Sequence, residues 1–368
     1  MNIYVLGMFL TLIFNAGVKH SIMLDGKRKK KLMFGFALIV WGGIMALRGT
    51  SVGTDTLNYK QLFLETVSAG WAELPQTSLF YHCPVYTIYS KLAGMICADP
   101  QMIVAVNALV YMTGMLLFLY KNSTDYGISI YCLLSFHDYF YAMNAQRLSL
   151  AVMLIMWSYH FGIRNKKKTS ILFLILAILT HNSAVAGAAV TFASLIQMNG
   201  RITYVFLTAV AVIMPLMRQI AVIFTYFFPA YASYANISNG WNSIYYEGGG
   251  GGRRALIALF LLVIFGVCLI WKLRFKIRNT DDEVFWRLFF LSMIAILSMI
   301  IWRKVYIFAR LEYYFNYFFL IFIPYCSEHF FNKASRRMVY ASVIAVMFIP
   351  FYVKLADYLP YITFFSEN

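Results

Sequence analysis

Charged residues are scarce in this sequence of 368 residues. Only 12% are Asp, Glu, Lys or Arg, about half of the share that is usual in a soluble globular domain. Hydrophobic residues make up 61%, and the mean hydropathy is +0.68. The composition therefore excludes an ordinary soluble protein. It predicts an all-α polytopic integral membrane protein, with residues 1–368 forming a single membrane domain.

Metal-binding and redox motifs are also lacking. The five cysteines lie apart, without a CxxC pair and without the His/Cys spacing that is typical of a metal site. No DxD motif is present, and the one acidic run, Asp281–Glu283, follows a basic loop. The cysteines are interpreted as buried apolar residues, and we expect no metal and no cofactor. We also expect no cleaved signal peptide, since a basic n-region and a small-residue cleavage site are missing.

Long apolar runs predict about twelve membrane crossings (11–13), because about 20 helical residues span the hydrocarbon core. The expected crossings are 3–22, 32–47, 101–120, 127–141, 146–163, 169–181, 183–198, 202–226, 254–272, 286–302, 311–326 and 336–354. The two segments around His181 are short, so they fit either two spans or a re-entrant hairpin. Residues 48–100 form a loop, in which 78–98 carry His82, Pro84 and Lys91 and predict an interfacial or partly inserted segment.

Lysine and arginine predict the orientation. Most of the 31 basic residues fall on one side if the run "DGKRKKK" (25–31) and the loop "RNKKK" (164–168) face the same compartment. Positive charge in short loops marks the cytoplasm, so both termini are expected outside. The net charge of +16 is then a signal of topology and of attraction to anionic membrane lipids. It is no sign of nucleic-acid binding.

The basic residues left on the outer side are mostly arginines, whereas the inner loops are rich in lysine. Arginine can grip a phosphate at two points, which lysine cannot do. Four of these arginines belong to different predicted helices and are candidates for binding an anionic head group: Arg48, Arg147, Arg218 and Arg310. The alternative is snorkelling and contact with lipid phosphates at the interface.

Five short motifs resemble a known family. They are "LRGTSVGTDTLNY" (47–59), "NAQRLSLAV" (144–152), "AILTHNSAV" (177–185), "RLEYYFNYF" (310–318) and "LPYITFF" (359–365). In this order they resemble EpsG-like, Wzy-type bacterial polysaccharide polymerases, the family of O-antigen, capsule and exopolysaccharide polymerases. The likeness covers most of the chain, although residues 199–300 match in pattern only. The repeat-unit sugars, the linkage anomer and the type of polymer stay open.

The resemblance implies a GT-C-like glycosyltransferase in the bacterial inner membrane with its active site facing the periplasm. Its substrates would be lipid-linked oligosaccharide donor and acceptor: a growing glycan is transferred from undecaprenyl pyrophosphate to a lipid-linked repeat unit. Partners would include a chain-length regulator and a flippase of the same pathway. Arginines would neutralise the pyrophosphate leaving group without a metal. Arg48, Arg147 and Arg310 are the first candidates, and Arg218 is the fourth.

Such a transfer benefits from a base that takes the proton of the acceptor hydroxyl. The candidates are Asp55, which Gly53 helps to aim inward, and His181; with Arg147 they form the predicted catalytic set. Asp55 could instead cap a helix or pair with Arg48, and His181 could be structural. The predicted sugar-binding residues are His137, Asp138, Tyr59, Tyr314 and Trp241.

The segment 227–253 contains tyrosines, asparagines and five successive glycines, and predicts a periplasmic loop that acts either as a lid or as a simple connector. Competing functions are a flippase or transporter of lipid-linked oligosaccharide, an O-antigen ligase, an O-acyltransferase and a non-catalytic scaffold. A transporter would need charge along a path across the bilayer, often in two repeated halves, and no repeat is evident. The unexplained charge lies on one side, which favours the polymerase.

Overall fold

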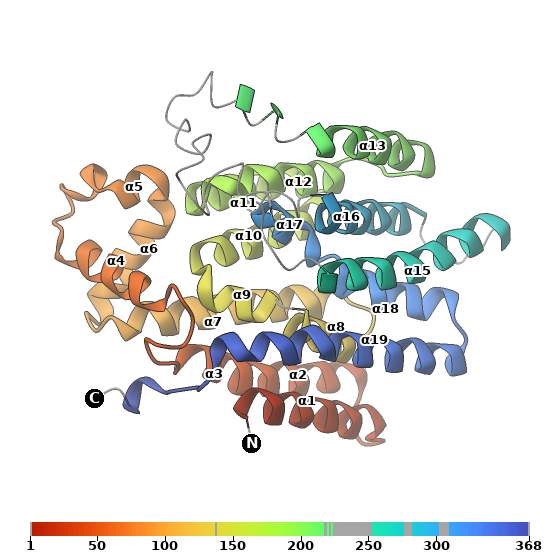
Figure 1. Ribbon diagram of the computed structural model, residues 1–368, viewed down its shortest axis with the longest axis horizontal. Coiled ribbons are helices and arrows are strands. Elements are labelled where there is room, and N and C mark those ends of the chain that lie inside the picture. Colours follow the sequence, from red (N-terminus) through yellow and green to blue (C-terminus); the bar gives the residue numbers. More distant parts are fainter. Residues whose placement is uncertain are drawn as a thin grey trace. The chain divides into compact units, whose positions relative to one another are not determined.

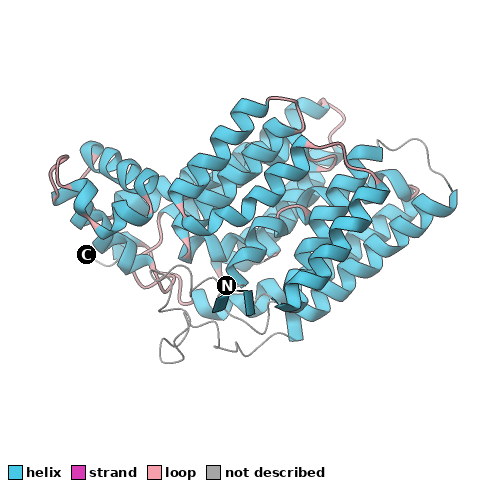
Figure 2. Ribbon diagram, turned by 90° about the horizontal axis from the view of Figure 1, so that it is seen from above, coloured by secondary structure: helices cyan, strands magenta, loops and turns pink. Residues whose placement is uncertain are grey.

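The computed structural model describes residues 2–136, 138–216, 219–220, 222–223, 252–275, 282–301 and 309–366. Within these residues the regular structure is helical, as Figure 2 shows, and no strand is formed. The fold class predicted from composition is confirmed at this level. The chain divides into two compact units, one formed by residues 1–191 with 338–368 and the other by residues 192–337.

The first unit carries the residues on which the site is built. Its helices are α1 (Ile3–His20), α2 (Gly26–Ala37), the π-helical turn η1 (Leu38–Gly42), α3 (Gly43–Ala46), α4 (Thr56–Ser68), η2 (Leu74–Gln76), α5 (Ser78–His82), α6 (Pro84–Ile96), α7 (Gln101–Asn122), α8 (Tyr126–Ser135), α9 (Asp138–Asn144), α10 (Gln146–Gly162), α11 (Lys167–Thr180) and η3 (Asn182–Gly187). Most of α19 (Lys333–Lys354), with η9 (Leu355–Tyr358) and η10 (Phe364–Ser366), also belongs to it.

The second unit is also helical where it is described. It comprises α13 (Gly200–Ile213), η4 (Met214–Leu216), α15 (Gly252–Phe275), α16 (Asp282–Ile301), α17 (Ala309–Asn316) and α18 (Phe319–Phe330). Helix α12 (Ala188–Leu195) runs across the boundary between the two units.

Five helices of the described chain are long and apolar enough to cross a membrane: α1, α7, the apolar parts of α15 and α16, and α19 with the turn that follows it. A multi-pass membrane protein is therefore supported. The number of twelve crossings and the outward position of both termini remain predictions. Most of the other predicted crossings coincide with shorter helices, for example α10 and α11.

Two predicted crossings are interrupted. The segment 127–141 is divided into α8 and α9 around Phe136, where the backbone leaves the helical conformation. The segment 311–326 is divided into α17 and α18 at Tyr317 and Phe318. Polar residues accompany both breaks: His137 and Asp138 follow Phe136, and Asn316 directly precedes Tyr317.

The predicted loop 48–100 contains three helices, which lie together in Figure 1 (α4, α5 and α6, orange). The ammonium of Lys91, on α6, donates hydrogen bonds of 2.6 and 2.5 Å to the carbonyls of Val67 and Ala69 at the end of α4. A cation at a helix C-terminus is favourable because the last carbonyls are unpaired. Lys91, a charged residue of the predicted interfacial segment, thus has a structural role.

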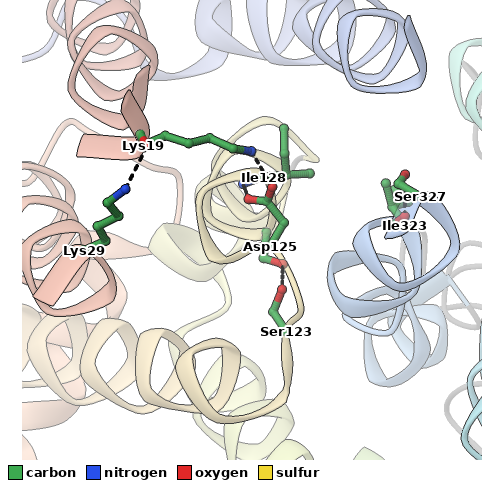
Figure 3. Close-up of polar contacts among 8 residues, drawn as sticks. Lys19, Lys29, Ser123, Asp125, Ile128, Ile323 and Ser327 are labelled. Carbon is green, nitrogen blue, oxygen red and sulfur yellow. Dashed lines mark hydrogen bonds and ion pairs between the residues drawn. The ribbon is translucent and has the colours of Figure 1, made fainter. Parts of the chain in front are cut away.

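Lysines of the predicted cytoplasmic side also join helix ends. Lys19, at the end of α1, forms a 2.7 Å ion pair with Asp125, and this carboxylate also caps α8 by accepting from the N–H of Ile128 (Figure 3). Lys29 donates to the carbonyl of Lys19 at 2.8 Å. Part of the positive charge in these loops is therefore used to hold helix termini together.

The C-terminal segment is bound to the loop after α3. The N–H of Gly49 donates to the carbonyl of Ile362 at 2.7 Å, and the N–H of Phe364 donates to the carbonyl of Leu47 at 3.1 Å. An isolated bridge pairs Arg48 with Thr363. Motifs that are more than 300 residues apart in the sequence thus form one local structure.

Candidate functional site

Arg48 lies inside the first unit, with 1% of its surface exposed. Its guanidinium donates to the carbonyl of Met143 at 2.9 Å and to the carbonyl of Met45, and its Nε lies 3.5 Å from the hydroxyl of Thr56. Burial lowers the pKa of Arg48 to about 10, so the side chain remains protonated at neutral pH. These contacts favour a structural role that joins α3, α4 and α9.

Arg147 is placed differently, at the N-terminal end of α10. Its guanidinium lies over the rings of Tyr59 and Tyr86, 5.7 and 6.0 Å from their centroids. Nη1 lies 3.6 Å from the sulfur of Cys83, and the buried Nε has no acceptor. No carboxylate of the described residues forms an ion pair with Arg147. A cation that forms no ion pair with the described residues is suited to an anionic ligand.

Asp55 and Gly53 form the turn that precedes α4. Gly53 has a φ of +92°, which confirms that the turn needs a residue free of Cβ. Asp55 is exposed and stands at the N-cap position, but its side chain forms no capping hydrogen bond. One helical turn later, the hydroxyl of Tyr59 accepts a 3.4 Å hydrogen bond from the N–H of Arg147. Helix α4 thus connects the turn that carries Asp55 to the start of α10.

We expect Gly53→Ala to destabilise the protein. A Cβ at this position would lie 2.6 Å from Oδ1 of Asn144, and a positive φ costs an L-residue about 1–2 kcal/mol. A lower melting temperature of the purified protein in detergent is the expected result. Gly17→Ala is the matched control, because nothing lies within 4 Å of its added Cβ on α1. Equal melting temperatures for the two variants would contradict the prediction.

His181 lies at the tip of a helical hairpin. The hydroxyl of Ser158, on α10, is 3.2 Å from that of Ser170 near the start of α11 and 2.8 Å from that of Thr191 on α12. Ser170 and Thr191 thus lie beside the same residue of α10. The chain therefore reverses its direction between α11 and α12, in the segment that begins at His181. The two segments around this residue thus run antiparallel, which fits both arrangements that the sequence left open, two spans or a re-entrant hairpin.

The same contact places Arg147 and His181 at one end of the α10–α11 pair. Arg147 precedes Ser158 by 11 residues, and His181 follows Ser170 by 11 residues on the antiparallel helix. At 1.5 Å per residue, each lies about 16 Å from the serine contact, in the same direction. The structure therefore places two of the predicted catalytic residues at the same position along the axis of the α10–α11 pair.

The ring of His181 contacts Ser183 at the start of η3. Nδ1 accepts from the N–H of Ser183 at 3.3 Å and lies 2.8 Å from the hydroxyl of Ser183. A backbone N–H can only donate, so Nδ1 acts as an acceptor in this contact.

The remaining predicted residues are distributed as follows. Asp138 is completely buried at the start of α9, and Tyr59 is 6% exposed. In the second unit, Arg310 and the fully buried Tyr314 lie one turn apart on α17. His137, Arg218, Trp241 and nearly all of the loop 227–253 lie outside the described residues. Among the described residues, no three His, Cys, Asp or Glu side chains form a group that could hold a metal.

The sequence profile of the EpsG family matches residues 31–365, nearly the whole chain. The chain belongs to the EpsG family. This is a family of Wzy-like polysaccharide polymerases, which confirms the resemblance carried by the short motifs and suggests a glycosyltransferase-type polymerase in a membrane. No curated protein and no solved structure matches the chain.

In this EpsG-family protein, three residues around Arg147 were missed by the sequence analysis. Cys83 was interpreted only as a buried apolar residue, and Tyr86 and Asn107 were not singled out at all. Tyr86 faces the guanidinium of Arg147. Asn107 donates a 3.1 Å hydrogen bond to the hydroxyl of Tyr86. No local sequence pattern predicts these contacts, because they join residues of α6, α7 and α10 that are far apart in the chain.

Proposed function

We propose that this protein is a polysaccharide polymerase that transfers a growing glycan from a polyprenyl pyrophosphate to a lipid-linked repeat unit on the outer face of the bacterial inner membrane. The observation that carries the proposal is the guanidinium of Arg147. It is partly buried, packed against two tyrosine rings and without a carboxylate partner among the described residues. Membership of a polymerase family supports the same reaction.

In the proposed reaction, an acceptor hydroxyl oxygen attacks the anomeric carbon of the donor glycan. The new C–O bond forms as the bond from that carbon to the pyrophosphate oxygen breaks, and the electron pair leaves with the pyrophosphate. Arg147 binds the negative charge that develops there, which stabilises the transition state more than the ground state. We expect inversion at the anomeric carbon, since the transfer occurs in one displacement.

The proton of the acceptor hydroxyl needs a base. The exposed carboxylate of Asp55 is our choice, because Nδ1 of His181 already accepts hydrogen bonds from Ser183. We assign to His181 the donation of a hydrogen bond from Nε2 to a phosphate or sugar oxygen. Arg310, on α17, stays a separate candidate for phosphate contact.

Complementation of a strain that lacks this protein tests the function. The wild-type gene is expected to restore a ladder of glycan chains on a gel, in place of single repeat units. Restored export of single units without a ladder would identify a transporter. Transfer of single units to another acceptor would identify a ligase. Either of these results would overturn the proposal.

A further inference from the structure

We propose that Tyr59 and Tyr86 are positioning residues that fix the direction of the Arg147 guanidinium, and that Asn107 and Gln146 in turn fix Tyr86. The proposal rests on the role of Arg147 in the proposed function. It gives Tyr59 a different task from the sugar contact that the sequence predicted.

The two rings form a support for the cation. Tyr59 comes from α4 and Tyr86 from α6, and their centroids lie 6.2 Å apart at an interplanar angle of 65°. Both rings are buried, with 6% and 2% of their surfaces exposed, so their faces are shielded from water. The electron-rich face of an aromatic ring attracts a guanidinium most strongly where water is excluded. This attraction therefore favours the orientation of Arg147 in which its guanidinium packs against the two tyrosines.

The hydroxyls tie this support to α10 itself. Tyr59 accepts from the backbone N–H of Arg147 at 3.4 Å, and Tyr86 accepts from Nδ2 of Asn107 at 3.1 Å. Nδ2 of Asn107 also donates to Oε1 of Gln146, the residue that precedes Arg147. Asn107 and Gln146 are 4% and 2% exposed, so these contacts form within the protein and not at its surface. The chain of contacts starts and ends at the first turn of α10.

The rings of Tyr59 and Tyr86 therefore cover one side of the Arg147 guanidinium. Nη1 points to the sulfur of Cys83, which is a weak acceptor, whereas Nε has no partner. A phosphate group can use neighbouring N–H groups of the planar fork at once. A guanidinium that is held in place loses less freedom when this contact forms in the transition state. The tyrosines therefore act on the rate through Arg147, without contact to the reacting atoms.

Paired variants of each tyrosine test the proposal. Purified full-length protein is supplied with lipid-linked repeat units extracted from the strain that lacks it, and kcat and KM of elongation are measured. Tyr59→Leu and Tyr86→Leu are expected to lower kcat by about tenfold with little change in KM, because the ring faces are lost. Tyr59→Phe keeps the ring and loses a long hydrogen bond of 3.4 Å from the N–H of Arg147, so it is expected to restore most of the rate. Tyr86→Phe loses the contact with Asn107 and is expected to lower kcat by about threefold.

Tyr120→Leu is the matched control, since Tyr120 also lies under a cation, 5.6 Å from Nζ of Lys30, but on the predicted cytoplasmic side. It is expected to leave kcat unchanged. Full kcat in Tyr59→Leu and Tyr86→Leu would overturn the proposal. If the leucine variants do not accumulate, the phenylalanine variants decide, and a full rate in Tyr86→Phe contradicts the positioning role. Absence of elongation by the wild type would instead overturn the proposed function.

Discussion

Arg147→Lys is expected to stop glycan elongation while the protein accumulates normally in the membrane. Lysine keeps the positive charge and much of the length of the side chain, but it loses the planar fork that holds a pyrophosphate at two points. Arg147 is only partly buried, and its guanidinium contacts two tyrosines and one sulfur. The substitution is therefore expected to cost little folding stability. Removal of one preorganised donor to a developing negative charge lowers a rate on the order of a hundredfold.

The measurement is the glycan ladder in the complemented strain, with the amount of protein in the membrane determined from the same cells. Arg28→Lys is the control, because the Arg28 side chain is 71% exposed on α2. We expect single repeat units with Arg147→Lys and a full ladder with Arg28→Lys. A full ladder with both variants would show that Arg147 is an interface anchor and would remove it from the site.

Arg48→Lys is expected to damage the fold itself. The guanidinium donates to the carbonyls of Met45 and Met143 within a fully buried position, and a single ammonium cannot keep both contacts and the approach to Thr56. Each lost hydrogen bond from a charged group costs about 1.5–3 kcal/mol. A carbonyl left unpaired in the interior adds to this cost. The loop after α3 and the C-terminal segment that pairs with it should both loosen.

Thermal unfolding of the purified variants in detergent measures this effect. Arg48→Lys is expected to melt several degrees below the wild type and to accumulate in smaller amounts, whereas Arg147→Lys melts with the wild type. The two arginines would thus separate into one that supports the structure and one that acts on the substrate. A normal melting temperature for Arg48→Lys together with a lost ladder would restore the phosphate contact that the sequence predicted for Arg48.

The helices that the sequence predicted best are those in which one apolar run forms one helix. The expected crossings 101–120, 146–163 and 336–354 correspond to α7, α10 and α19. The position of Arg147 at the opening of α10 and the interruption at His181 were also predictable. Both are visible as polar residues at the boundary of an apolar run, which is a local property of the chain.

The roles of Arg48 and Tyr86 were not predictable, because they depend on contacts between distant segments. Arg48 reaches a carbonyl 95 residues away and pairs through its backbone with Thr363. The same arginine in the same motif could face substrate or interior, and only the packing of α9 and of the C-terminal segment decides between them. Tyr86 is one tyrosine among 27, and the guanidinium above it lies four helices later in the sequence.

The most direct test of the central claim uses the purified protein and one substrate. Lipid-linked repeat units from the strain that lacks this protein are incubated with wild type or with Arg147→Lys, and the glycan length and the released polyprenyl pyrophosphate are measured. We predict that the wild type yields longer glycans and one pyrophosphate lipid for each unit added, and that Arg147→Lys yields both about a hundredfold more slowly. Repeat units left unchanged by the wild type, or elongation at the same rate by both proteins, would contradict the claim that Arg147 stabilises a pyrophosphate leaving group in a polymerase.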